Sequence, residues 1–115
     1  MANKQNRVTA IFAALADPTR RRILVRLSER GECPVTALAR PFSISLPGFS
    51  KHLRVLEQAR LIERHRKGRL HLICARAAGL REAQKWMAQC AAFWDSRFDQ
   101  LDELLRSEEG KEKKR

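Results

Sequence analysis

The sequence predicts a mainly α-helical protein with one small β-hairpin and a long last helix. Apolar residues recur at helical spacing from about residue 8 to residue 56, and this spacing returns from about residue 78 to residue 106. Between them, two short alternating runs flank a Lys-Gly turn at residues 67–68. With 115 residues, 43% of them hydrophobic, we expect one domain over residues 1–106 and a charged, disordered tail over residues 107–115.

The first two helices are separated by an Asp-Pro pair. Four apolar residues have the i, i+3, i+4, i+7 spacing of one helical face: Val8, Ile11, Phe12 and Leu15. We therefore expect a first helix over about residues 7–16. Asp17 can cap the second helix, Pro18 suits its first turn, and Gly31 marks its end. The arginines of this helix are predicted to be solvated, with a phosphate contact as the alternative: Arg20, Arg21, Arg22 and Arg26.

The next segment contains two short helices separated by a tight turn. The first begins at Pro34 and stops before Pro41, because proline disfavours a helical conformation in the residue that precedes it. After a connection over residues 42–44, Ser45 can cap the second helix, and Pro47 needs no amide donor so early in a helix. This arrangement is that of a helix-turn-helix.

The second helix of this pair is amphipathic. At about 100° per residue, Phe49, Leu53 and Leu56 share one narrow sector. Lys51 and Arg54 lie on the opposite side. Small residues at positions 45, 48 and 50 would let the backbone approach a DNA duplex, so that Lys51 and Arg54 reach phosphates or guanine edges. For the segment alone, a surface helix with a solvated basic face is the alternative.

A β-hairpin follows this helix. The two strands are predicted over residues 61–66 and 69–74, with Lys67 and Gly68 as the loop. The register stays open, because a two-residue loop there pairs Ile62 with Ile73, whereas Leu70 favours the other face. The predicted order of helix, helix, helix-turn-helix, hairpin and long helix defines a winged helix-turn-helix with a long C-terminal dimerisation helix.

Positive charge is concentrated in the middle of the chain. The net charge is +11, and residues 17–76 carry 14 basic and 5 acidic side chains, whereas residues 77–115 carry 8 of each. Such a distribution favours a polyanionic partner for the middle part. The hairpin tip adds three positive charges around Gly68, which suits a basic finger in a DNA groove, with a solvated loop tip as the alternative: Arg66, Lys67 and Arg69.

The last helix carries an apolar stripe close to a heptad repeat. Arg97 interrupts the stripe, and Phe98 restores apolar contact one residue later. A helix of about 28 residues is roughly 42 Å long, more than so small a domain can cover, so we expect a second copy of the chain to cover it. The predicted dimer interface combines the first and last helices: Val8, Ile11, Phe12, Leu80, Met87, Cys90, Trp94, Phe98 and Leu101.

Several classes of protein do not fit the sequence. It contains no apolar run long enough to cross a membrane, and residues 1–7 lack the apolar region of a secretory signal. We expect a cytoplasmic protein that does not bind membranes. The three cysteines are an odd number at wide spacing, which disfavours a disulfide framework. No glycine-rich phosphate loop or carboxylate cluster occurs, so we expect neither an enzyme nor a cofactor.

The cysteines and histidines do not form a recognisable metal motif. No set of three or four convergent ligands can be assembled at these spacings from the side chains considered: Cys33, Cys74, Cys90, His52, His65 and His71. Cys90 lies on the apolar stripe, so redox sensing through its symmetry mate is an alternative to simple packing. His52, at the edge of the amphipathic helix, is either a DNA contact or a packed, hydrogen-bonded histidine.

Three segments resemble one known family, the ArsR-type transcriptional repressors. They are residues 14–24 (ALADPTRRRIL), residues 45–56 (SLPGFSKHLRVL), and residues 60–62 (RLI) ahead of a basic Lys-Gly-Arg turn. The resemblance covers roughly residues 8–105 and rests on three motifs in the right order. Within the family, Trp86 and the Phe93-Trp94 pair are similar to the branch of autorepressors that bind no metal. The resemblance implies a homodimer that binds a palindromic, inverted-repeat operator in double-stranded DNA and blocks transcription.

The resemblance also implies where DNA and effectors would bind. Pro34 and Thr36 stand where many metal-sensing members carry a pair of cysteines, and no histidine follows His71. We therefore expect no metal site, and the small-molecule effector stays unknown. A redox- or metal-responsive repressor and a sequence-neutral nucleic-acid binder are the alternatives. The predicted DNA-binding residues, from the physical pattern and the resemblance together, are Ser45, Leu46, Pro47, Gly48, Ser50, Lys51, His52, Arg54, Arg66, Lys67, Gly68 and Arg69.

Overall fold

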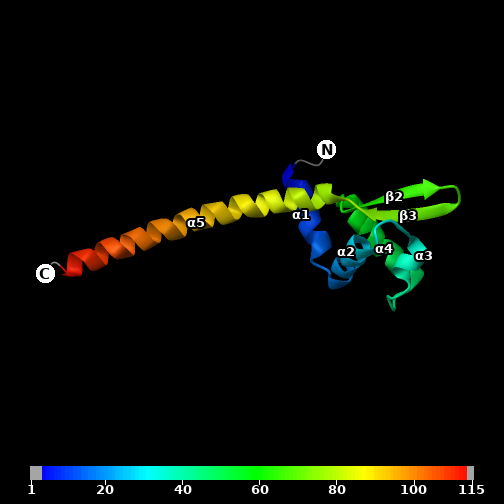
Figure 1. The fold of residues 1–115 in the computed structure, drawn as a ribbon, viewed down its shortest axis with the longest axis horizontal. Coiled ribbons are helices and arrows are strands. Elements are labelled where there is room, and N and C mark those ends of the chain that lie inside the picture. Colours follow the sequence, from blue (N-terminus) through cyan, green and yellow to red (C-terminus); the bar gives the residue numbers. More distant parts are fainter. Residues whose placement is uncertain (1–3, 114–115) are drawn as a thin grey trace. The chain divides into compact units, whose positions relative to one another are not determined.

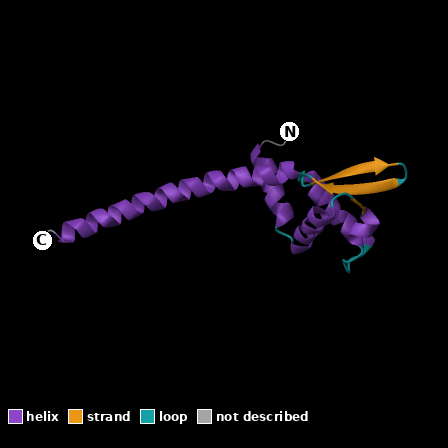
Figure 2. Cartoon of the chain, in the orientation of Figure 1, coloured by secondary structure: helices purple, strands orange, loops and turns teal. Residues whose placement is uncertain are grey.

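The computed structural model describes residues 4–113, with side chains over residues 6–110. It confirms the predicted fold class, mainly α-helical with a small antiparallel sheet and a long last helix (Figures 1 and 2). The chain divides into two units, Met1–Ala83 and Gln84–Arg115. The elements are α1 (Lys4–Leu15), α2 (Pro18–Arg30), β1 (Cys33–Pro34), α3 (Val35–Ala39), α4 (Leu46–Gln58), β2 (Ile62–Lys67), β3 (Leu70–Ala75) and α5 (Ala77–Lys113).

The first unit closes around an apolar core. Helices α1 to α4 and the sheet each contribute side chains to this core, and in Figure 1 α2 and α4 lie beside the base of the hairpin. Fully burying one such side chain stabilises a fold by about 1.5–3 kcal/mol. The largest fully buried side chains are Ile11, Ile23, Leu27, Leu38, Phe49, Leu53, Leu56, Leu61, Ile62 and Ile73.

The junction between α1 and α2 has the predicted caps. The Asp17 carboxylate accepts hydrogen bonds from the backbone amides of Thr19 and Arg20, at 2.7 and 3.2 Å, and Pro18 occupies the first turn. Arg20 itself is not free in solvent, because its guanidinium donates to the carbonyl oxygens of Ala14 at 2.7 Å and Ala13 at 3.1 Å. It therefore satisfies carbonyl groups at the carboxyl end of α1.

The sheet has three antiparallel strands in the order β1-β3-β2. The short strand β1 was not predicted, and it pairs Cys33 with Ile73. The predicted loop is wrong by one residue, because Lys67 pairs with Leu70 and leaves Gly68 and Arg69 as the loop. The cause is the positive φ of 62° at Gly68, which a glycine at the first position of a two-residue hairpin loop supplies without strain.

Helix α5 is longer than predicted. It runs to Lys113, so residues 107–113 are helical where we expected disorder, and the two last residues lie outside the described part of the chain. Glutamate and lysine are good helix formers, and Arg106 donates to Asp102 one turn earlier at 3.3 Å. Within the second unit, every side chain described is exposed except that of Cys90, which is half-buried.

The predicted dimer stripe is only partly available to a partner. Val8 and Ile11 are 7% and 1% exposed within a single chain, and Ile11 belongs to the core, so their place at an interface stays a prediction. The spacing of the apolar residues in α1 predicts which face is buried, but it does not distinguish burial in the core from burial at an interface. Phe12 is partly buried and Cys90 half-buried. The other predicted interface residues are exposed: Leu80, Met87, Trp94, Phe98 and Leu101.

Candidate DNA-binding surface

Helix α4 is held in place by one apolar face. Its buried residues are Phe49, Leu53 and Leu56, as predicted from their spacing. The Ser45 hydroxyl accepts a hydrogen bond from the Gly48 amide at 3.2 Å, which confirms the predicted N-cap. The opposite face of α4 is therefore presented outward from a fixed base.

The turn between α3 and α4 is anchored by aromatic packing. Phe42 is buried and lies 5.5 Å from Phe49, measured between ring centroids. The Arg22 guanidinium lies over the Phe42 ring, 5.0 Å from its centroid. Because Leu38 of the short helix α3 is also fully buried, both helices of the pair are fixed to the core. This arrangement is the one that presents a second helix to a DNA groove.

The outward face of α4 carries the two predicted cations. Lys51 and Arg54 are exposed, whereas Ser50 is half-buried. A glycine at position 48 is also favoured by the local structure, in addition to the predicted close approach to DNA. A Cβ at this position would lie 3.0 Å from Ile44 Cγ2 and 3.1 Å from the Ser45 hydroxyl, so a larger residue would press against the N-terminal turn.

His52 belongs to a polar cluster at the edge of α4. Its Nδ1 lies 3.3 Å from Arg20 Nη1, which supports the packed, hydrogen-bonded interpretation. Arg20 Nη1 is also 3.8 Å from Asp17 Oδ2. Desolvation acts to raise the pKa of the Asp17 carboxyl, but the amides of Arg20 and Thr19, together with the Arg20 and His52 side chains, lower it more, so this pKa lies below its ordinary value.

The hairpin places the second set of cations. Arg66, Lys67 and Arg69 are exposed around the glycine turn at its tip. At the base of the hairpin, Arg64 Nε lies 3.1 Å from Glu57 Oε2, which joins β2 to the end of α4. Both sets of predicted DNA contacts therefore stand on one unit with a shared core.

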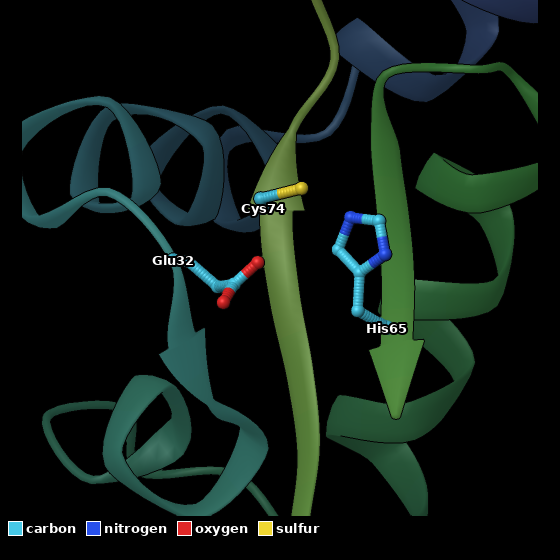
Figure 3. Close-up of side chains that lie close together, drawn as sticks. All are labelled: Glu32, His65 and Cys74. Carbon is cyan, nitrogen blue, oxygen red and sulfur yellow. The ribbon is translucent and has the colours of Figure 1, made fainter. Parts of the chain in front are cut away.

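A third group of side chains gathers on the sheet and was not found from the sequence. Glu32, His65 and Cys74 lie close together (Figure 3). Desolvation raises the pKa of the Cys74 thiol, and the nearby carboxylates of Glu63 and Glu32 raise it further. Spacing along the chain does not reveal this group, because strand pairing brings its three residues together from separate segments.

The fold and this surface define a DNA-binding winged helix-turn-helix protein. A helix-turn-helix domain family matches residues 15–65. The chain is 39% identical over 77 residues to the transcriptional repressor SdpR of Bacillus subtilis, an alignment that covers 67% of this chain and 84% of that protein. The chain belongs to the ArsR family of transcriptional regulators.

Solved structures agree with this assignment. The crystal structure of an ArsR family transcriptional regulator is 40% identical, with a TM-score of 0.75, and the match covers 84% of this chain and 98% of that one. A homodimeric winged helix-turn-helix DNA-binding domain from Mycobacterium bovis, at 24% identity and a TM-score of 0.59, supports the fold; the match covers 82% of this chain and 83% of that one.

Membership of a family of transcriptional regulators confirms that the chain is not an enzyme. None of the helices over residues 4–113 combines the length and hydrophobicity needed to span a lipid bilayer.

Proposed function

We propose that this chain is a homodimeric transcriptional repressor that recognises an inverted-repeat operator. The observation that carries the proposal is the geometry of α4, whose apolar face is buried and whose N-terminus is capped, while Lys51 and Arg54 are exposed. A helix fixed in this way can enter the major groove, where an arginine or lysine pairs with guanine or with phosphate. In a two-fold dimer, two such helices read half-sites about 34 Å apart.

Repression and dimerisation have separate support. The related SdpR is a transcriptional repressor, and the related domain from Mycobacterium bovis is homodimeric. In this chain, α5 exposes large apolar side chains that a soluble regulator would have to cover. A second copy supplies an equal and complementary stripe.

The proposed contacts fall into two sets. The helix α4 and its N-terminal turn read the major groove, and the hairpin tip follows the phosphate backbone or enters the adjacent minor groove. His52 acts mainly by holding Arg20 at the edge of α4. The two sets are Ser45, Leu46, Pro47, Gly48, Ser50, Lys51, His52 and Arg54 in the first, and Arg66, Lys67, Gly68 and Arg69 in the second.

The test is binding to the DNA upstream of the chain's own gene, measured by fluorescence anisotropy at several salt concentrations. Lys51→Ala is expected to weaken binding and to reduce the slope of log K against log salt by about 0.9 for each phosphate that is no longer neutralised. Lys85→Ala is the matched control, since Lys85 is also exposed but lies on α5. Binding by Lys51→Ala equal to that of the parent would contradict the proposal.

A sequence-neutral binder is the second candidate, favoured by the excess of 14 basic over 5 acidic side chains in residues 17–76. Competition separates the two functions. A specific repressor is displaced from its operator by unlabelled operator far better than by a random duplex, by about 10³-fold or more. Equal displacement by both duplexes would support the sequence-neutral function instead.

A further inference from the structure

The sheet at the base of the hairpin brings together three side chains of different chemistry. One ligand atom each from Glu32, His65 and Cys74 lies within 4.8 Å of the other two. Figure 3 shows Cys74 on the middle strand, with Glu32 from the segment before β1 on one side and His65 of β2 on the other. All three belong to the first unit, Met1–Ala83. The cluster therefore needs neither the second unit nor a second chain.

Strand register explains the convergence. Glu63 pairs with Cys74 and His65 pairs with Leu72 across β2 and β3. Since alternate residues of a strand share a face, His65 and Cys74 lie diagonally on the same face of the hairpin. On the other side of β3, Cys33 pairs with Ile73, which places Glu32 beside Cys74.

The local charge differs from that of the surrounding surface. Glu63 lies close to this group, with its Oε2 3.9 Å from His65 Nε2. Two carboxylates and a thiol therefore gather on a sheet whose tip is strongly basic. Two carboxylates beside a thiol attract a divalent cation, whose binding displaces the thiol proton.

We propose that Glu32, His65 and Cys74 bind one divalent transition-metal ion of the zinc class. Thiolate sulfur, imidazole nitrogen and carboxylate oxygen are the ligands that Zn²⁺ takes in proteins, and three protein ligands leave a fourth position for water or for Glu63. Tetrahedral ligands at zinc bond lengths lie about 3.3–3.8 Å apart. The 4.8 Å limit on the present separations can close to this range by side-chain rotation.

This site differs from the position where, by the resemblance, many metal-sensing members carry a cysteine pair and where this chain has Pro34 and Thr36. A bound ion would tie the segment after α2 to both strands of the hairpin. Its ligands are separate from Lys51 and Arg54, so metal binding can succeed or fail independently of the proposed operator binding.

Cobalt(II) gives a direct test, because it binds the same types of ligand as Zn²⁺ and its complexes absorb visible light. The reduced full-length protein is titrated with Co²⁺ and its absorption spectrum is recorded. We expect one equivalent per chain, a thiolate-to-cobalt charge-transfer band, the intense visible bands of four-coordinate cobalt, and loss of all of these when Zn²⁺ is added.

Single substitutions assign the ligands. Cys74→Ser should abolish the charge-transfer band, and His65→Gln and Glu32→Gln should each weaken Co²⁺ binding by more than about tenfold, since even losing an outer-shell partner of a metal site costs about 10- to 100-fold. Each substitution has a matched control of the same residue type outside the cluster, and these controls should bind as the parent does: Cys90→Ser, His71→Gln and Glu29→Gln.

Three results would overturn the proposal. They are the absence of a stoichiometric thiolate–cobalt complex in the parent, a charge-transfer band that persists in Cys74→Ser, and a band that is lost in Cys90→Ser. Circular dichroism establishes that each variant is folded. If Cys74→Ser fails to fold, Glu32→Gln serves as the test, since Glu32 is exposed and its substitution should leave the fold intact. An unchanged Co²⁺ affinity in that variant would contradict the site.

Discussion

The two units of this chain differ in the exposure of their apolar side chains. The first unit buries a core to which α1 to α4, the start of α5 and the sheet contribute, and it leaves most of its cations outside. The second unit is one helical segment in which large apolar side chains are exposed: Met87, Phe93, Trp94, Phe98, Leu101, Leu104 and Leu105. Exposed apolar patches of this kind mark interaction surfaces.

Charge separates the units in the same way. Residues 17–76 carry 14 basic and 5 acidic side chains, whereas residues 77–115 carry 8 of each. A strongly positive α5 would repel a second copy of itself, so electrical balance suits self-association there. Positive charge suits the surface that meets DNA. We therefore propose that the first unit recognises DNA and that the second unit associates with a second copy.

The largest effect is expected from charging the aromatic face of α5. Trp94 and Phe98 are 53% and 61% exposed, and their ring centroids lie 6.1 Å apart. Placing both at a dimer interface would bury two aromatic side chains, at about 1.5–3 kcal/mol each. The double variant Trp94→Glu/Phe98→Glu should raise the dimer dissociation constant by more than about 100-fold, as measured by analytical ultracentrifugation.

The opposite face of α5 offers the control. Ala92 and Ser96 are exposed and lie on the far side of the helix from Trp94 by the 100° rule. The double variant Ala92→Glu/Ser96→Glu adds the same charge to the same helix and should leave dimerisation unchanged. Equal weakening by both double variants would show that net charge, rather than the aromatic face, determines association.

A substitution in the first unit should behave differently. Leu53 is fully buried beneath α4, so Leu53→Ala should lower the free energy of unfolding by about 2–5 kcal/mol. Urea unfolding at two protein concentrations checks this. The decrease should be the same at both concentrations, whereas the decrease in the α5 double variant should shrink on dilution. A decrease for Leu53→Ala that depends on protein concentration would contradict the assignment of Leu53 to the core of a single chain.

Local rules predicted most of the first unit. The Asp17 and Ser45 caps and the buried stripe of α4 depend on neighbours within one or two turns, and each was found where expected. Strand β1 has only two residues and exists because β3 is beside it, so no local pattern marks it. The predicted hairpin loop was wrong by one residue because Gly68, rather than Lys67, opens the loop, and the register that the pattern left open is fixed by the pairing of Lys67 with Leu70.

Long-range contacts account for what local spacing could not predict. A helical stripe looks the same whether it faces the chain's own core, as Ile11 does, or is left exposed, as Trp94 is. The Glu32, His65 and Cys74 cluster joins three segments through the sheet register, so it cannot be read from spacing along the chain. The disordered tail was predicted from polarity alone, although its glutamates and lysines also favour helix.

A smaller effect is expected from the Asp17 charge. The pKa of Asp17 is lowered in the folded chain, so its ionised form stabilises the fold above its ordinary pKa of 3.8, and this contribution is lost as the pH falls through the folded pKa. Asp17→Asn keeps a capping side chain but removes the charge. The variant should be less stable than the parent at neutral pH and equally stable in strong acid, as measured by thermal unfolding across pH. A stability difference that does not change with pH would exclude the charge as its cause.

The smallest effects should come from two ion pairs, one in each unit. Arg7 Nη2 lies 3.0 Å from Glu82 Oε1 within the first unit, with side chains 35% and 20% exposed. Arg106 Nη2 lies 3.3 Å from Asp102 Oδ2 on α5, with side chains 78% and 64% exposed.

Arg106→Gln should lower the free energy of unfolding by at most about 0.3–0.5 kcal/mol, and high salt should remove even this difference. Arg7→Gln should lower it by up to about 1 kcal/mol, and this difference should be less sensitive to salt. Urea unfolding at low and high salt tests both. A larger, salt-resistant destabilisation at Arg106 would mean that the last turns of α5 are partly buried against another surface, and the second unit would then be covered beyond its aromatic stripe.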